Sequence, residues 1–296
     1  MSEMSEQPRI LVVNADDFGL SEGVNAGIIG AFRRGIVRSA SLMMTTPGFE
    51  DAVELARANP DLDLGLHLTL TNTRPVLDPA RIPSLVRRDG RFHSLPVFQA
   101  RVAMKQLDPM ELRAEILAQV ARARRTKLRF SHLDGHHHVH LFGLVATLAG
   151  DMARQHTIPI VRRIEDAPCV GKNGVPVGPP VPASLGEAVK RGWLESADRR
   201  WGGQFFGLPR GDAFRGFTFP DSLERWRALA DSLPYGVTEL MCHPGLHDES
   251  VRALDPYVAE REHELRWLCD PRVAALLAAE GVTLGSFRQL LDAAQA

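Results

Sequence analysis

The chain alternates between short apolar runs and longer segments in which apolar residues recur every three to four positions. Runs of the first kind are compact and rich in branched side chains, which is typical of buried parallel strands. We predict such strands at 10–15, 36–44, 62–70, 128–133, 158–161, 237–242 and 282–284. The longer segments predict helices at 21–35, 49–58, 110–125, 141–155, 185–197 and 222–233, with two more closing the chain.

Regular alternation of strand and helix predicts an α/β fold with parallel strands and crossover helices. We expect a single domain over 1–296 that forms a (β/α) barrel, distorted or incomplete; a doubly wound open sheet is the alternative. Residues 71–108 and 164–220 break the rhythm with many prolines and glycines. We interpret both as irregular insertions, and the first as a lid over the site, since loops of this length are usually functional or disordered.

Composition and charge narrow the range of partners. Charged residues make up 24% of the chain, and the net charge is −1. The sequence has no basic stripe, so we expect no nucleic-acid partner. We expect no signal peptide, because the first ten residues contain acids and no apolar segment. No apolar run reaches the ~18 residues of a membrane span. Cys169, Cys242 and Cys269 show no CxxC spacing, so we expect reduced thiols and a cytoplasmic protein. The sequence leaves the oligomeric state open, with a homodimer as one alternative.

The stretch SHLDGHHHVH, Ser131–His140, carries five of the eleven histidines. Imidazole is a common ligand for divalent metals and also suits proton transfer near neutral pH, so this clustering predicts a functional site. If the segment is extended, His136, His138 and His140 share one face. If it is helical, His136 pairs with His140 instead. Both alternatives place His136 at the strand exit.

Other polar residues follow different strands at the same relative position. Asp16-Asp17 follow the first strand, His67 lies late in the third, and His243 follows a late strand. The carboxyl ends of barrel strands form one mouth, so these residues are expected to meet there with His136. Helix capping by the aspartates, a buried core position for His67 and a turn position for His243 are the alternatives.

Four motifs resemble those of the YdjC-like carbohydrate deacetylases, a family that includes the chitooligosaccharide deacetylases and is similar to the NodB-type polysaccharide deacetylases. They are NADDFG (Asn14–Gly19), GLHLTL (Gly65–Leu70), HLDGHHHVH (His132–His140) and TELMCHPG (Thr238–Gly245). The resemblance implies a barrel-like fold and hydrolysis of sugar N-acetyl groups with a divalent metal. It implies Asp17, His67 and His136 as metal ligands and Asp16 as general base. No usable motif falls within 164–220.

One oxygen and two nitrogen ligands would leave coordination positions open for water and substrate. The metal would polarise the acetamide carbonyl and lower the pKa of the water that attacks it. His243 is the candidate acid for the amine leaving group, and Arg162 a candidate substrate contact. Asp134 and His138 are candidates for orienting the metal site from outside the ligand set.

Alternatives remain for the identity of the metal ion and for the class of reaction. Ligand type favours zinc, whereas the family favours magnesium, so we expect one divalent ion of either kind. The substrate would be a chitooligosaccharide-like amino sugar. A two-metal phosphoesterase, which would also use His138 and His140, and a non-catalytic metal- or sugar-binding protein are the rival functions.

Overall fold

The computed structural model describes residues 8–156, 158–165, 184–252, 254–289 and 291. Cys169 and most of the first half of the predicted 164–220 insertion lie outside these ranges. The described strands are β1 Arg9–Phe18, β2 Ser39–Met43, β3 Asp63–Leu68, β4 His132–Gly135, β5 Ile160–Val161, β6 Ala213–Arg215, β7 Gly236–Cys242 and β8 Val282–Gly285. The α-helices are α1 Glu22–Arg34, α2 Phe49–Arg57, α3 Leu95–Ala103, α4 Pro109–Arg125, α5 Gly143–Gln155, α6 Leu185–Trp201, α7 Leu223–Asp231, α8 Glu249–Arg252, α9 Ala259–Leu268 and α10 Pro271–Ala279. Three 3-10 helices complete the described elements: η1 Pro79–Arg81, η2 His136–Leu141 and η3 Gly202–Phe205.

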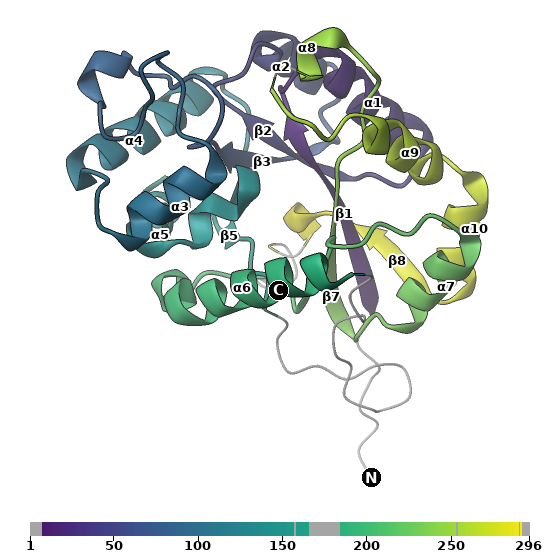
Figure 1. Cartoon of the computed structure of the whole chain (residues 1–296). Helices are drawn as coiled ribbons and strands as arrows, with labels where there is room; N and C mark the ends of the chain where they lie inside the picture. Colours follow the sequence, from purple (N-terminus) through teal and green to yellow (C-terminus); the bar gives the residue numbers. More distant parts are fainter. Residues whose placement is uncertain (1–7, 157, 166–183, 253, 290, 292–296) are drawn as a thin grey trace.

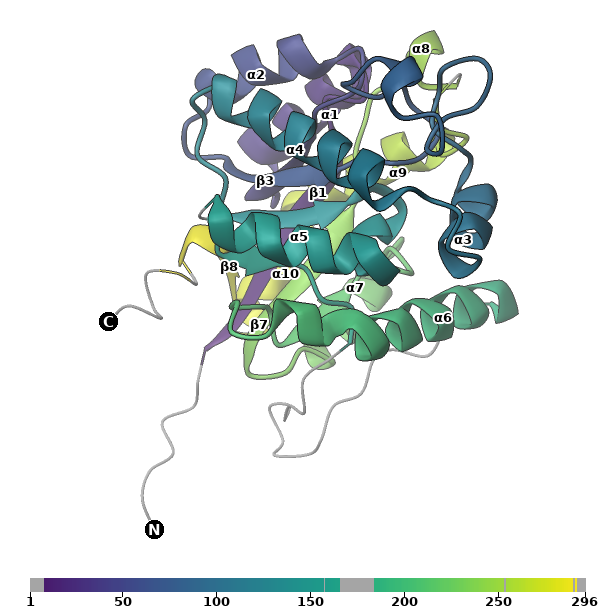
Figure 2. The ribbon, with the colours of Figure 1, turned by 90° about the vertical axis from the view of Figure 1, so that its left-hand side faces the viewer.

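All described strands belong to one parallel sheet, in the order β5-β4-β3-β2-β1-β7-β6, and β8 pairs with the first half of β1. The edge strands β5 and β6 do not pair with each other within the described ranges, so the sheet is curled without closing. Helices surround it on the outside (Figure 1). In Figure 2, α4, α5 and α6 lie one below another on the side that faces the viewer. The predicted α/β fold, an incomplete barrel, is confirmed.

Local sequence explains why these elements form. Ser21 caps α1 by accepting a hydrogen bond from the backbone N–H of Val24, and Asp108 caps α4 in the same way. β1 is buried along nearly its whole length between neighbouring strands, as its continuous apolar run predicts. None of the helices in the described ranges combines the length and apolarity of a membrane-spanning segment.

One strand begins later than predicted, and another was not predicted. β4 starts only at His132, because the chain leaves α4 through Lys127 in the left-handed region (φ 61°) and passes Leu128 and Phe130 as a half-buried loop. β6 was not predicted, since its three residues lie in an aromatic, glycine-rich stretch without clear periodicity. The predicted insertion 71–108 contains η1 and α3, and its role as a lid stays a prediction.

Candidate metal centre and active site

Two adjacent aspartates reach the same pocket because β1 is irregular at its end. The register between β1 and β2 shifts between Ala15 and Phe18, and Asp17 has a positive φ of 66°. In a regular strand Asp16 and Asp17 would point to opposite faces, whereas a bulge redirects one of them. Aspartate tolerates the left-handed region better than most side chains. Both carboxylates therefore line one pocket.

His67 is held at the end of β3 with its two ring nitrogens facing different acids. Nδ1 lies 2.7 Å from Oδ1 of Asp134, on the neighbouring strand, and Nε2 lies 3.5 Å from Oδ1 of Asp17. Burial alone would lower the pKa of His67, but Asp134 and Asp17 raise it to about 10. In the ion-free protein the ring is therefore protonated, with Nδ1–H donating to Asp134. Nε2 is buried and has no hydrogen-bond partner among the residues that the structure describes.

The segment after β4 adopts neither of the two predicted conformations. It forms the 3-10 helix η2, in which His137 and His138 have left-handed backbone angles (φ 55° and 57°). This turn directs His136 toward Asp17, with 2.9 Å between Nδ1 and Oδ1. His140 instead contacts the backbone carbonyl of Arg162 at 3.1 Å.

Three residues thus converge from β1, β3 and η2. Asp17, His67 and His136 each offer one ligand atom, and these atoms lie within 4.8 Å of one another. The rings of His67 and His136 lie 5.8 Å apart, edge to face. A carboxylate oxygen and two imidazole nitrogens form a donor set that suits zinc and other divalent ions. The residues therefore fit a divalent ion.

Arg162 lies beneath this group and binds three carboxylates. Its guanidinium donates to both oxygens of Asp16 at 2.7 and 2.6 Å, and it lies 2.8 Å from Asp134 and 2.6 Å from Glu239. Burial raises the pKa of Glu239 to about 7, against the lowering effect of Arg162. Arg162 is 1% exposed and is not part of the pocket wall. A residue in direct contact with the substrate, as we predicted for Arg162, would be expected to line the pocket.

A second buried arginine, Arg261 of α9, holds the outer oxygen of Asp17. One guanidinium nitrogen donates to Oδ2 of Asp17 at 2.7 Å and to Asp255 at 2.6 Å. Burial alone would raise the pKa of Asp17, but His136 and Arg261 hold it well below its usual range. Oδ1 is thereby left to face the two histidines.

The balance of buried charge favours a cation. The acids around the two arginines are Asp16, Asp17, Asp134, Glu239 and Asp255. Two guanidinium groups leave this set with a net negative charge even when Glu239 is half protonated. Without a metal ion, protonated His67 neutralises part of that charge. A divalent ion would offset that excess at the position where the ligand atoms meet.

His243 enters the pocket from the end of β7. Its backbone N–H donates to Glu264, and its ring lies 5.4 Å from the ring of Tyr257. The loop that follows packs closely on α1: a Cβ added to Gly27 would lie 2.4 Å from Cα of Gly245. This close approach requires glycine at position 27, because any larger residue there would collide with the backbone of Gly245. Cys242 is fully buried, and its thiol donates to the carbonyl of Asn14 at 3.3 Å.

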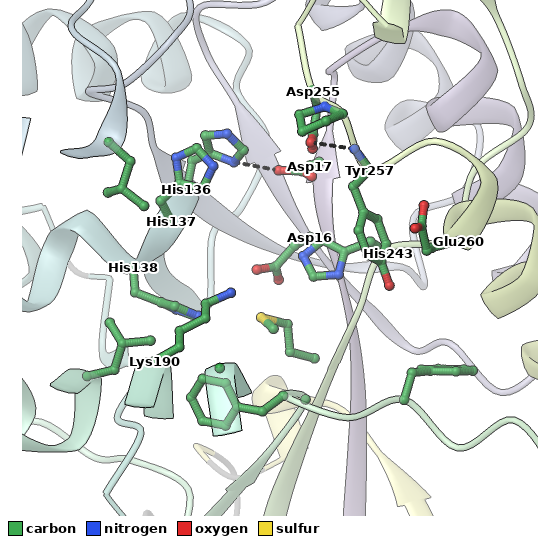
Figure 3. A pocket seen from close by; sticks show the side chains of 18 of the residues that line it. Asp16, Asp17, His136, His137, His138, Lys190, His243, Asp255, Tyr257 and Glu260 are labelled. Carbon is green, nitrogen blue, oxygen red and sulfur yellow. Dashed lines mark hydrogen bonds and ion pairs between the residues drawn. The ribbon is translucent and has the colours of Figure 1, made fainter. Parts of the chain in front are cut away.

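The pocket has a volume of about 720 Å³ and unites most of the predicted site residues. Figure 3 shows Asp16, Asp17, His136, His138 and His243 around one space. Its wider wall combines charged groups with apolar groups. The charged groups include Lys190 of α6 and Glu260 of α9, and the apolar groups include Leu95 of α3, Trp193 of α6 and Phe217 before α7. Asp134 lies outside the wall and is hydrogen-bonded to His67; its role in orienting that ring as a metal ligand stays a prediction.

Some residues of this site escaped prediction from sequence. Arg261 and Asp255 lie in a charged segment whose pattern is that of a solvated helix. Glu239 carried a usable signal, because an acid inside the apolar run of β7 needs a buried partner.

Fold and site together define a parallel α/β protein with a candidate divalent-metal centre at the carboxyl ends of its strands. The chain belongs to the family described as YdjC-like protein, whose family model matches residues 10–279. A carbohydrate deacetylase of Geobacillus stearothermophilus is 33% identical over 95% of this chain and 98% of its own length. A carbohydrate deacetylase of Vibrio vulnificus (strain CMCP6) is 30% identical over 96% of this chain and 97% of its own length.

A solved structure of the same shape supports the fold assignment. It is that of a putative cellobiose-phosphate cleavage protein from Enterococcus faecalis V583, with a TM-score of 0.74 and 27% identity. The similarity covers 96% of this chain and 99% of that one. The resemblance expected from the four sequence motifs is therefore confirmed at the level of the family.

Proposed function

We propose that this protein is a metal-dependent carbohydrate N-deacetylase that hydrolyses the acetamide group of an amino sugar. The observation that carries the proposal is the convergence of Asp17, His67 and His136 in one pocket with a further carboxylate, Asp16, beside them. Relatives that match almost the whole chain are named carbohydrate deacetylase. A pocket with both ligand atoms and separate acid and base groups suits catalysis better than simple binding.

Asp17, His67 and His136 would hold the ion, zinc or magnesium. The buried Nε2 of His67 supports this assignment, because it lacks a hydrogen-bond partner in the described ranges. A divalent ion bound there supplies Lewis acidity toward an amide carbonyl. Arg261 keeps Oδ2 of Asp17 engaged, so that the carboxylate offers Oδ1 to the ion.

Asp16 is proposed as the general base. Arg162 fixes its carboxylate through two hydrogen bonds, and the amide of Asn14 donates to Oδ1 at 2.8 Å. A carboxylate held in one orientation at the pocket wall can accept the proton of the attacking water without reorganising. Arg162 therefore acts in this proposal by positioning Asp16, and it does not touch the sugar.

His243 is proposed as the general acid. An amine leaves an acylated sugar only when its nitrogen receives a proton, and His243 reaches the same pocket from a different strand. The neighbouring Tyr257 ring and the backbone contact with Glu264 restrict where the imidazole can lie. Asp16 and His243 thus divide proton removal and proton delivery between two groups.

The substrate is proposed to be a chitooligosaccharide-like N-acetylated sugar. The cavity is large enough for more than one ring, and Trp193 and Phe217 offer apolar surfaces for the C–H faces of sugars. Polar groups lie deeper, where the acetamide would react. This division between a polar floor and partly apolar walls is usual for ligand pockets.

Metal analysis of the purified protein combined with an acetate-release screen tests the proposal. The screen covers N-acetylated monosaccharides and chitooligosaccharides, assayed with magnesium and with zinc after removal of bound ions. We expect acetate release that depends on a divalent ion and is absent from a His67→Ala variant. A folded, ion-loaded protein that releases acetate from none of these sugars would contradict the proposal.

A further inference from the structure

Two of the histidines that follow His136 have partners within the protein. Nδ1 of His137 lies 2.9 Å from the hydroxyl of Thr71, and Nε2 of His140 lies 3.1 Å from the carbonyl of Arg162. The ring of His137 also packs on that of His136, with 3.9 Å between their centroids. These contacts give both residues a part in holding η2 in place.

His138 has no such partner among the described residues. Its ring makes no hydrogen bond in the described part of the chain, and Nδ1 is buried without a partner. Yet the residue is only 4% exposed, and it lines the pocket that contains Asp17 and His136. A buried polar ring without hydrogen bonds is costly unless a ligand supplies them.

The backbone at His138 supports a role in binding. His137 and His138 both lie in the left-handed region (φ 55° and ψ 23°, φ 57° and ψ 30°), which is uncommon for residues other than glycine. Strained backbone of this kind concentrates at functional sites. These two consecutive left-handed residues allow His136, His137 and His138 all to line the pocket.

The surroundings of His138 fit part of a sugar ring. Its imidazole meets the aromatic rings of Phe214 and Phe217 at centroid distances of 6.0 and 6.3 Å. Phe217 also lines the pocket and can pack against C–H groups. An imidazole can both donate and accept a hydrogen bond, and so can a hydroxyl group. No metal-binding group found among the described residues includes His138.

We infer that His138 is a substrate-binding residue whose imidazole hydrogen-bonds one hydroxyl group of the sugar. The inference rests on the proposed deacetylase function and adds a contact that selects a hydroxylated ring beside the reacting acetamide. Figure 3 shows the His138 side chain reaching into the same space as Asp16 and Lys190. The role is distinct from that of a metal ligand and from that of the general acid or base.

Two variants and a set of substrate analogues test it. His138→Phe keeps a ring against Phe214 and Phe217 but removes both nitrogens. His138→Asn places an amide nitrogen near the position of Nδ1, the atom that is buried without a partner. With an N-acetylated sugar that the unmodified protein hydrolyses, His138→Phe should raise KM roughly tenfold with little change in kcat, as expected for a lost hydrogen bond in ground and transition state. His138→Asn should recover most of that loss.

Analogues that each lack one hydroxyl identify the partner. With the unmodified protein, kcat/KM for one of these analogues should be roughly tenfold lower than for the complete sugar. With His138→Phe, kcat/KM should be the same for that analogue and for the complete sugar. His247→Phe, which changes a histidine outside the pocket, serves as the matched control and should behave as the unmodified protein. Bound metal, measured on each protein, should be unchanged.

The outcomes separate the two proposals. If the unmodified protein hydrolyses N-acetylated sugars but His138→Phe has normal KM, or lowers kcat alone, the hydroxyl contact is wrong and the proposed function stands. The contact is also wrong if every analogue keeps its full penalty in His138→Phe. If the unmodified, ion-loaded protein hydrolyses no N-acetylated sugar, the deacetylase function itself fails.

Discussion

Binding of the ion should release a proton from His67. In the ion-free protein Asp134 and Asp17 raise the pKa of this imidazole to about 10, against the effect of burial. Its Nδ1–H is committed to Asp134, so the proton that an ion must displace is the one on Nε2, which faces Asp17. Because metal ligands must be deprotonated, affinity depends on pH below that pKa.

The free-energy cost of removing this proton follows from the difference between the pH and the pKa of His67. At pH 7.5 the pKa lies about 2.5 units higher, so deprotonation costs about 3 kcal/mol at about 1.36 kcal/mol per unit. Each rise of one pH unit below the pKa should strengthen binding about tenfold, and pH 7.0 to 8.5 roughly 30-fold. The sign is fixed: affinity rises with pH, because the free protein binds one proton more than the complex.

Isothermal titration with magnesium, in buffers of different ionisation enthalpy, measures both the affinity and the number of protons released. We expect about one proton per ion at pH 7.5. Asp134→Asn should reduce this number, because a neutral amide no longer stabilises the imidazolium, provided that circular dichroism shows a folded protein. His247→Ala should leave the proton count unchanged. Zero proton release together with a constant affinity between pH 7.0 and 8.5 would refute the assignment of His67 as a ligand.

Four further predictions concern single residues. His136→Ala should lower the amount of metal bound in elemental analysis, because the ring lies 2.9 Å from Asp17, and unchanged content would reject it as a ligand. Asp16→Asn should retain metal but reduce kcat by roughly 10²–10⁴, the usual range for a lost general base, and a near-normal rate would exclude that role. Cys242→Ser should leave kcat unchanged, since the thiol is buried on the carbonyl of Asn14; a folded but inactive variant would contradict this. Burial raises the pKa of Glu239 to about 7, so the unmodified protein loses stability as the pH rises from 4.5 through 7 and this side chain ionises. Over this interval the free energy of unfolding of Glu239→Gln should therefore rise by about 3 kcal/mol relative to that of the unmodified protein, measured by urea unfolding with chelator. A difference that does not change with pH would count against this prediction.

The main parts of the fold and the site could be predicted from periodicity and from strand ends. β1 and α1 followed from an apolar run and a serine cap, and both are local signals. The meeting of Asp17, His67 and His136 followed from topology alone, because carboxyl ends of parallel strands share one edge. Such inferences need no knowledge of side-chain conformation.

Other parts depend on long-range packing, which no local pattern encodes. Arg261 reaches Asp17 across 244 residues, and its helix has the mixed charges of a solvent-facing segment. The conformation of η2 was also out of reach, because left-handed backbone at two successive histidines contradicts their local preference. Local rules often fail at positions where function imposes strain, which agrees with the binding role that we infer for His138.

The arrangement around Arg162 bears on the number of ions. Asp16, His67 and Asp134 also bring three ligand atoms together, as a second metal site would require. The guanidinium of Arg162 already lies between two of these residues, 2.6 Å from Asp16 and 2.8 Å from Asp134. A two-metal phosphoesterase needs ions about 3.5–4 Å apart, so the second ion would have to displace a buried, permanently charged group. We therefore expect one ion per chain, and two tightly bound ions in elemental analysis would favour the phosphoesterase over the deacetylase.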